Sequence, residues 1–136
     1  MFRLTREPID IQKTVESIQK PEDGAVVVFD GVVRNHSKDK SVRYLEYYAY
    51  ESMALKKLEE VGARARSGYA IRNIAIVHRL GRLDVGECSV AIVVASAHRG
   101  PAFEACRFAI DTIKEIVPIW KKEFYENGEV WIEGGH

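Results

Sequence analysis

The stretch from Ser96 to Glu123 constrains the fold of this chain more than any other part of its sequence. An apolar run, Val90–Ala95, leads through Ser-Ala-His-Arg-Gly-Pro into a helical pattern that must end near Pro118, because proline cannot donate the backbone hydrogen bond. The pattern predicts a buried strand followed directly by an amphipathic helix over 101–117. The start of such a helix offers free backbone N–H groups and the positive end of the helix dipole, so it suits an anion.

Cationic side chains flank this helix at both ends. His98 and Arg99 stand where the strand meets the helix, Lys114 lies within the helical segment, and Lys121 and Lys122 follow its end. Two interpretations of each group stay open. In the first, the side chains cap the helix or form a solvated surface. In the second, Arg99 binds a phosphate or carboxylate, and a lysine crowded by like charges acts as a proton donor or nucleophile.

The rest of the chain interleaves strands with helices. Periodicity and turn residues predict helices over 9–18 and 52–67, strands over 25–33, 42–50, 71–80 and 87–97, a polar loop over 34–41, a turn over 81–86 and a hairpin over 124–132. Gly31 indicates a bulge or a close backbone approach. Because some successive strands have only short connections, we expect an α+β fold with a mixed or antiparallel sheet, in one domain over 1–136.

Amino-acid composition argues against several classes of function but does not identify a substrate. Twenty basic residues balance twenty acidic ones among 136, which argues against a nucleic-acid or membrane-surface protein. Two cysteines, Cys88 and Cys106, are too few for a disulfide framework or a zinc site, so we expect reduced thiols. We find no metal-ligand spacing and expect no metal and no cofactor. The N-terminus lacks the apolar core of a signal peptide, and we expect a cytoplasmic protein.

Four segments in collinear order resemble the large, catalytic subunit of molybdopterin synthase, the MoaE family. The segments are GAVVVFDGVVRNHS (24–37), VHRLGRLDVGE (77–87), SAHRGPAFEACRFAIDTIKEIVPIWKKE (96–123) and EVWIE (129–133). The resemblance covers about residues 20–133 and leaves 134–136 as an expected frayed tail. It implies an α/β-hammerhead fold and a homodimer. Each large subunit would bind one small ubiquitin-like subunit, giving a heterotetramer.

The resemblance also implies a reaction. The small subunit would carry a C-terminal Gly-Gly thiocarboxylate, and two sulfurs, one from each of two thiocarboxylates, would pass to cyclic pyranopterin monophosphate to form the dithiolene of molybdopterin. The family's two important lysines match Lys114 and Lys121, which we expect to be catalytic. The expected substrate-binding residues are these two lysines with Val32, Val33, Arg34, His98, Arg99, Lys122 and Glu123. One departure concerns Gly135, which stands where the family places an arginine that reaches into the neighbouring subunit.

Two alternatives remain beside this function. The first is a non-catalytic module that binds an anion or nucleotide, or that dimerises through the tyrosine-rich strand over 42–50. A simple phosphate cradle, however, would not need the second pair of lysines. The second is an RNA-binding domain that uses the basic loop and its tyrosines, against which the neutral net charge argues.

Overall fold

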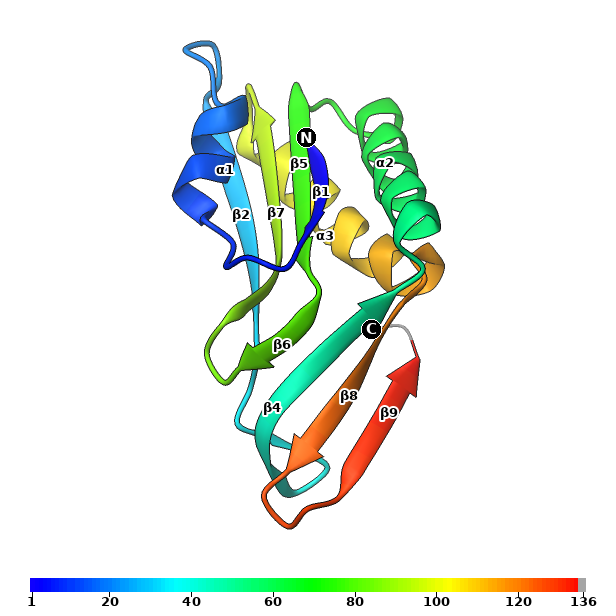
Figure 1. Cartoon of the computed structure of the whole chain (residues 1–136). Coiled ribbons are helices and arrows are strands. Elements are labelled where there is room, and N and C mark those ends of the chain that lie inside the picture. The colour runs from blue at the N-terminus through cyan, green and yellow to red at the C-terminus, as the bar shows by residue number, and fades with distance from the viewer. Residues whose placement is uncertain (135–136) are drawn as a thin grey trace.

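A computed structural model describes residues 1–134, which form two β-sheets and three helices (Figure 1). The first sheet has the strand order β1-β5-β7-β2. Its strands are β1 (Phe2–Thr5), β5 (Asn73–Arg79), β7 (Cys88–Ser96) and β2 (Ala25–Val32). β1 pairs with β5 in parallel, whereas the other neighbours are antiparallel, so the sheet is mixed.

Helices cover both faces of this first sheet (Figure 1). They are α1 (Ile11–Ile18) on one face and α2 (Glu51–Gly68) with α3 (Arg99–Ile116) on the other. Side chains alternate along β5 accordingly, since Ala75 belongs to the α1 cluster and Ile74 and Ile76 to the α2 and α3 cluster. Burial on both faces explains the uninterrupted apolar runs Ile74–Val77 in β5 and Val90–Ala95 in β7.

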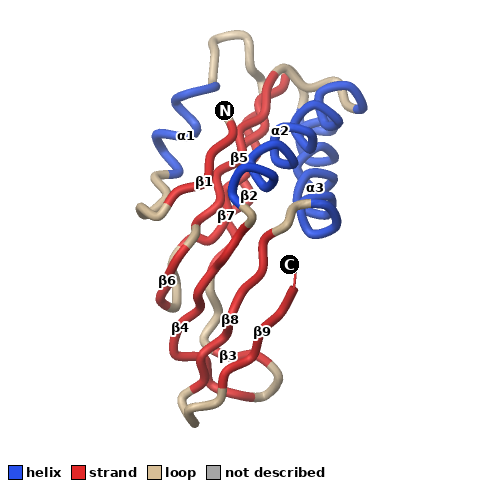
Figure 2. The backbone as a smooth tube through the Cα atoms, turned by 45° about the vertical axis from the view of Figure 1, so that its right-hand side comes forward, coloured by secondary structure: helices blue, strands red, loops and turns tan. Residues whose placement is uncertain are grey.

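The second sheet extends away from the helices (Figure 2). It contains β3 (His36–Ser37), β4 (Lys40–Ala49), β8 (Ile119–Tyr125) and β9 (Val130–Gly134), with β6 (Gly81–Asp84) also paired to β4. All of its pairings are antiparallel. The chain leaves α3 and enters β8 almost at once, so the two lysines after Pro118 lie on a strand.

The structure confirms the α+β class and its three helices, and it corrects several local expectations. The segment expected as a turn over 81–86 contains β6, and the expected loop over 34–41 contains β3 and the start of β4. α3 begins at Arg99 rather than at Pro101, because a proline in the first helical turn breaks no hydrogen bond there. Gly134 ends β9 instead of starting a frayed tail, and positions 135–136 lie outside the described residues.

Gly31 has the special role that the sequence predicts. The pairing of β2 with β7 shifts register between Gly31 and Val32, which marks a bulge. A Cβ atom at Gly31 would stand 2.7 Å from a methyl group of Val90 and 3.1 Å from the ring of Phe29. The absence of a side chain therefore permits close packing at the end of β2, where the candidate site begins.

Candidate active site

Lys114 of α3 and Lys121 of β8 line one cavity of about 150 Å³. α3 ends at Ile116, the N–H of the following Val117 still donates to the carbonyl of Ile113, and Pro118 then prevents continuation of the helix. β8 runs from this break along β4, which brings Lys121 beside the last turn of α3. The remaining lining residues are Phe29, Gly31, Val32, Tyr47, Ser89, Val90 and Ile110. The cavity is thus lined by two lysine side chains and by mostly apolar residues.

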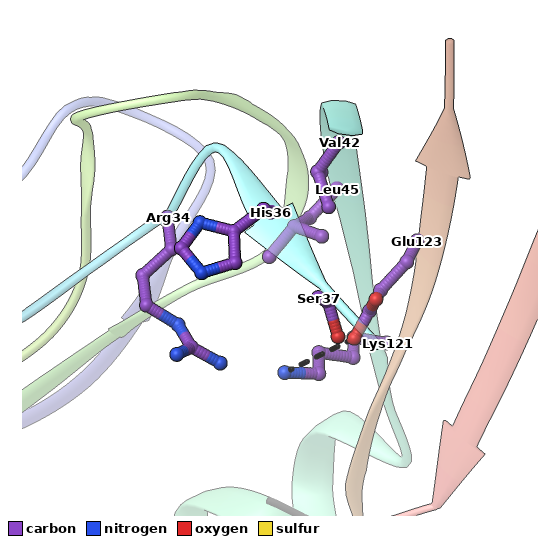
Figure 3. Close-up of a pocket in the computed structure, with 7 residues that line it drawn as sticks. All are labelled: Arg34, His36, Ser37, Val42, Leu45, Lys121 and Glu123. Carbon is purple, nitrogen blue, oxygen red and sulfur yellow. Dashed lines mark ion pairs between the residues drawn. The ribbon is translucent and has the colours of Figure 1, made fainter. Parts of the chain in front are cut away.

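A second, smaller cavity of about 30 Å³ shares Lys121 with the first. Its other lining residues are Arg34, His36, Ser37, Val42, Leu45 and Glu123 (Figure 3). Arg34 follows the end of β2, and β3 carries His36 and Ser37 across toward β8. Lys121 therefore stands between a cavity that contains Lys114 and one that contains Arg34. This arrangement brings Arg34 to the two lysines, which lie far from it in the sequence, as an anionic substrate would require.

Glu123 supplies the counter-charge to Lys121. Its Oε1 lies 3.7 Å from Lys121 Nζ, and its side chain is only 3% exposed. Burial alone would raise the pKa of Glu123. The hydrogen bonds from Tyr125 and Ser37 and the positive charges of Lys121 and Lys38 outweigh that effect and hold this pKa below its usual value. The Glu123 carboxylate is therefore ionised at neutral pH and forms a fixed part of the wall.

Lys122 lines neither cavity, and its expected role in substrate binding stays a prediction. Successive side chains of a strand point to opposite faces of the sheet, so Lys122 faces away from Lys121 and Glu123. Its ammonium group instead lies 5.1 Å from the centre of the Tyr48 ring.

His98 and Arg99 also lie outside both cavities. They stand at the start of α3 with exposed side chains, whereas Lys114 is in the last turn. At 1.5 Å per residue the helix places Arg99 about 22 Å from Lys114 along its axis. The expected role of His98 and Arg99 in substrate binding stays a prediction. The helix start and the lysine cavity are separate places.

The two valines at the end of β2 differ from each other. Val32 is exposed and lines the lysine cavity. Val33 lines neither cavity, because its side chain is buried in the core and its N–H donates to the carbonyl of Glu87 at 3.0 Å. Gly135, the departure noted in the sequence, lies outside the described residues.

Sequence reasoning missed several residues of the site. The sequence could have indicated Ile110, because this residue precedes Lys114 by four positions and so lies on the same face of α3. No sequence pattern indicates Tyr47, because its position in the site depends on the pairing of β4 with β8, which sets Tyr47 opposite Lys121. His36 and Ser37 were assigned to a loop, and only the β3–β4 hairpin brings them to Glu123 and Lys121.

Other chemistry is limited among residues 1–134. No group of three or more His, Cys, Asp and Glu side chains there could hold a metal ion. Both cysteines are free thiols, as expected, and burial raises the pKa of Cys88 to about 12 and that of Cys106 to about 11. Neither thiol is therefore a ready nucleophile at neutral pH. No helix in the described part of the chain is long and apolar enough to cross a membrane.

The fold and the site together define an α+β domain with a lysine-lined cavity suited to an anionic substrate. The family model described as MoaE protein matches residues 4–116. The molybdopterin synthase catalytic subunit of Halalkalibacterium halodurans is 44% identical over 131 residues, which span 96% of this chain and 84% of that protein. The catalytic subunit from Bacillus subtilis is 45% identical over 131 residues, 96% of this chain and 83% of that protein. This chain belongs to the MoaE family.

Solved structures agree with this family. Molybdopterin synthase from Staphylococcus aureus superposes with a TM-score of 0.91 at 42% identity, covering 98% of this chain and 96% of that one. A Helicobacter pylori complex of subunits 1 and 2 of molybdopterin-converting factor has the same fold, with a TM-score of 0.77 at 23% identity, covering 96% and 88% of the two chains. The family predicted from the sequence is thus confirmed, and the names of the relatives favour an enzyme over a binding module.

Proposed function

We infer that this chain acts as the catalytic subunit of a molybdopterin synthase. It would transfer two sulfurs, one from the C-terminal thiocarboxylate of each of two small ubiquitin-like subunits, to cyclic pyranopterin monophosphate, which becomes the dithiolene of molybdopterin. Water supplies the oxygen that converts each acyl group to a carboxylate when its sulfur has been transferred. The observation that carries this proposal is the shared cavity of Lys114 and Lys121. The two lysines come from different elements and line one cavity together with mostly apolar residues. Lys121 also lines the smaller cavity that contains Arg34.

The two lysines have different surroundings and so suit different tasks. Lys114 is exposed at the end of α3, where it can exchange protons with solvent, and we assign it the role of general acid and base. In that role it protonates the oxygen that leaves the pterin when sulfur replaces it. Lys121 is 23% exposed and ion-paired with Glu123, so its ammonium group is held in place. It holds the substrate and stabilises the negative charge that develops at the acyl carbonyl.

Arg34 completes the set as a binding group. Its planar guanidinium can donate two parallel hydrogen bonds to a phosphate, and it borders the cavity next to Lys121 (Figure 3). Val32 and Glu123 form the adjoining walls. His98 and Arg99 line neither cavity of the same chain.

The partner assembly is part of the proposal. The Helicobacter pylori neighbour was solved as a complex of two different subunits. A small subunit with a Gly-Gly thiocarboxylate suits this chain because the cavity places cationic side chains, which attract the thiocarboxylate, beside mostly apolar residues. We propose the same heterotetramer as the resemblance implies, with two copies of this chain and two small subunits. Neither nucleic acid nor a membrane enters this function.

The test combines this chain with a thiocarboxylated small subunit and the pterin precursor and then assays for dithiolene. We expect Lys114→Ala to reduce turnover at least a hundredfold with small-subunit binding retained, since general acid–base catalysis contributes about 10²–10⁴ in rate. Lys13→Ala is the matched control, because Lys13 is an exposed lysine of α1 on the opposite face of the first sheet. Full activity of Lys114→Ala would refute the assignment, and binding without turnover by the unaltered chain would favour the binding module.

A further inference from the structure

The segment 77–87 contributes to the family resemblance, but none of its residues lines either cavity. It runs from the end of β5 through β6 to the residue before β7. Two of its charged side chains form an ion pair, in which Nη1 of Arg79 donates to Oε2 of Glu87 at 2.9 Å. The Arg79 side chain is 7% exposed. Removing a guanidinium from water is costly, so this residue must have a specific structural or functional task.

The ion pair fixes the shape of the loop between β5 and β7. Nη2 of Arg79 also donates to the carbonyl of Arg82 at 3.1 Å, and Oε1 of Glu87 accepts from the N–H of Asp84 at 3.0 Å. The N–H of Glu87 donates to the carbonyl of Asp84 at 3.1 Å, in a turn whose third residue, Gly86, has a φ of +90°. Both partners of the ion pair therefore bind the backbone of β6. We call Arg79 and Glu87 the brace.

The loop that the brace closes also holds the strand end that carries Arg34. Val33 is bound through both of its backbone groups. Its N–H donates to the carbonyl of Glu87 at 3.0 Å, and its carbonyl accepts from the N–H of Gly86 at 2.9 Å. The pairing of β2 with β7 ends at Val32, and Arg34 directly follows Val33. These two hydrogen bonds therefore set the position from which the Arg34 side chain starts.

The same loop is attached to the sheet that carries Lys121. β6 pairs with β4, where Gly81 stands opposite Tyr47 (Figure 1). β4 pairs on its other side with β8, where Lys121 stands opposite the same tyrosine. Arg34 and Lys121 line one small cavity, and both are connected to the loop that the brace closes. The brace itself lies outside that cavity.

On the basis of the function proposed above, we propose that Arg79 and Glu87 are positioning residues for the anion site. The brace sets the separation between the Arg34 guanidinium and the Lys121 ammonium group, and thereby the affinity for the phosphate of the substrate. Lys114 lines only the other cavity, so the proton transfer assigned to it does not depend on the brace. Loss of the brace should therefore raise the KM for the pterin precursor and leave kcat nearly constant.

The first test compares two variants that each remove the charge of a carboxylate paired with an arginine. Glu87→Gln keeps the shape of the side chain but leaves Arg79 without its charged partner. Asp23→Asn does the same to Arg72, which precedes the opposite end of β5, so it is the matched control for lost stability. The full chains are titrated with inorganic phosphate and followed by NMR, under conditions in which urea denaturation shows all of them folded.

We expect the Kd for phosphate to rise about tenfold in Glu87→Gln, which corresponds to the loss of one charged hydrogen bond. In Asp23→Asn it should stay within about twofold of the unaltered chain, because distant sites act independently. Equal Kd values in the two variants would overturn the proposal.

The second test is a double-mutant cycle on the reconstituted reaction. In the unaltered background, Glu87→Gln should raise the KM for the pterin precursor about tenfold and leave kcat within about twofold. In an Arg34→Ala background, the same substitution should change KM less than about twofold, because the brace acts through Arg34. A purely structural role would lower the activity by the same factor in both backgrounds. Additive effects, or a lower kcat at unchanged KM, would refute the proposal.

These tests separate the positioning role from the function on which it rests. Weaker phosphate binding by Glu87→Gln, without dithiolene formation by the unaltered chain, would support the brace and refute the synthase. Dithiolene formation with the same KM in Glu87→Gln and in the unaltered chain would support the synthase and refute the brace. Absence of phosphate binding by the unaltered chain would overturn the anion site and the brace with it.

Discussion

Nζ of Lys121 lies 3.7 Å from Oε1 of Glu123, two positions further along the same strand. A strand returns to the same face after two residues, so both groups border one cavity. Glu123 is nearly buried and accepts a hydrogen bond of 2.8 Å from the hydroxyl of Tyr125, the next residue on that face. The alternation of β8 thus places a cation, a carboxylate and a phenol in a row.

The first prediction concerns this pair. Glu123→Gln removes the counter-charge of Lys121 while keeping the shape of the side chain. We expect turnover to fall about tenfold and the free energy of unfolding to fall by about 1–2 kcal/mol, because a buried charged hydrogen-bond acceptor is lost. Dithiolene assay and urea denaturation measure the two effects. Glu126→Gln, in the exposed turn after β8, is the control and should match the unaltered chain. Equal turnover in both variants would contradict the role of Glu123.

The second prediction uses the tight contact at Gly31. Gly31→Ala places a methyl group 2.7 Å from Val90 and 3.1 Å from Phe29, and both neighbours line the lysine cavity. We expect a loss of about 1–2 kcal/mol in unfolding free energy from overpacking, together with lower turnover. In Gly68→Ala the new methyl group meets nothing within 4 Å, so this control should be neutral or stabilise by up to about 1 kcal/mol. The prediction fails if the two variants unfold at the same urea concentration.

The third prediction concerns pH. His78 is fully buried, and its Nδ1–H donates to the carbonyl of Arg79 at 2.7 Å. Burial lowers the pKa of His78 from 6.5 to about 4, although the hydrogen bond to Arg79 opposes the shift. Between these two values the unfolded chain binds a proton that the folded chain does not, so stability falls as pH decreases. We expect unfolding free energy at pH 5 to be about 2 kcal/mol below that at pH 7.

His78→Gln should remove most of this pH dependence, because glutamine does not titrate. Urea denaturation at pH 5 and pH 7 tests both chains. The carboxylates of Asp23 and Glu123 have lowered pKa values, so they affect stability mainly below about pH 4. They therefore contribute little to the difference in stability between pH 5 and pH 7. An unchanged pH dependence in the variant would show that another group is responsible.

The fourth prediction concerns the contact between the end of α1 and the start of β5. Arg72 donates two hydrogen bonds to Asp23, at 2.6 and 2.7 Å, and the Asp23 side chain is 1% exposed. We expect Asp23→Asn to lower the free energy of unfolding by roughly 2–3 kcal/mol, because the guanidinium loses its charged partner. Asp84→Asn, which breaks an ion pair with Arg82 whose side chains are both more than half exposed, should cost less than about 0.5 kcal/mol. Similar costs for the two variants would refute the argument.

The hydrogen bonds between Asp23 and Arg72 also hold the pKa of Asp23 below its usual value. This carboxylate therefore stabilises the fold above about pH 4, and the stabilisation is lost as the pH falls through the lowered pKa. At pH 2, urea denaturation of the Asp23→Asn variant and of the unaltered chain should give more similar midpoints than at pH 7.

Much of the fold and part of the site could be predicted from the sequence. Apolar periodicity indicated all three helices and the strands β2, β5 and β7 of the first sheet, because burial of one or both faces leaves a regular pattern. The bulge at Gly31 followed from a glycine within a strand. The motifs around Lys114 and Lys121 identified the family and the two central lysines. β6 was missed because four residues rich in turn formers leave no such pattern.

Only the tertiary structure decided which cationic side chains meet. The rise of α3 separates Arg99 from Lys114, and the alternation of β8 turns Lys122 away from Lys121, although all four lie within one short stretch of sequence. Strand pairing brought in Tyr47 and the β3 hairpin from distant positions. The sequence by itself determined the elements and the family, since these depend on local patterns. The composition of the site depended on register and direction, which arise only when the elements pack.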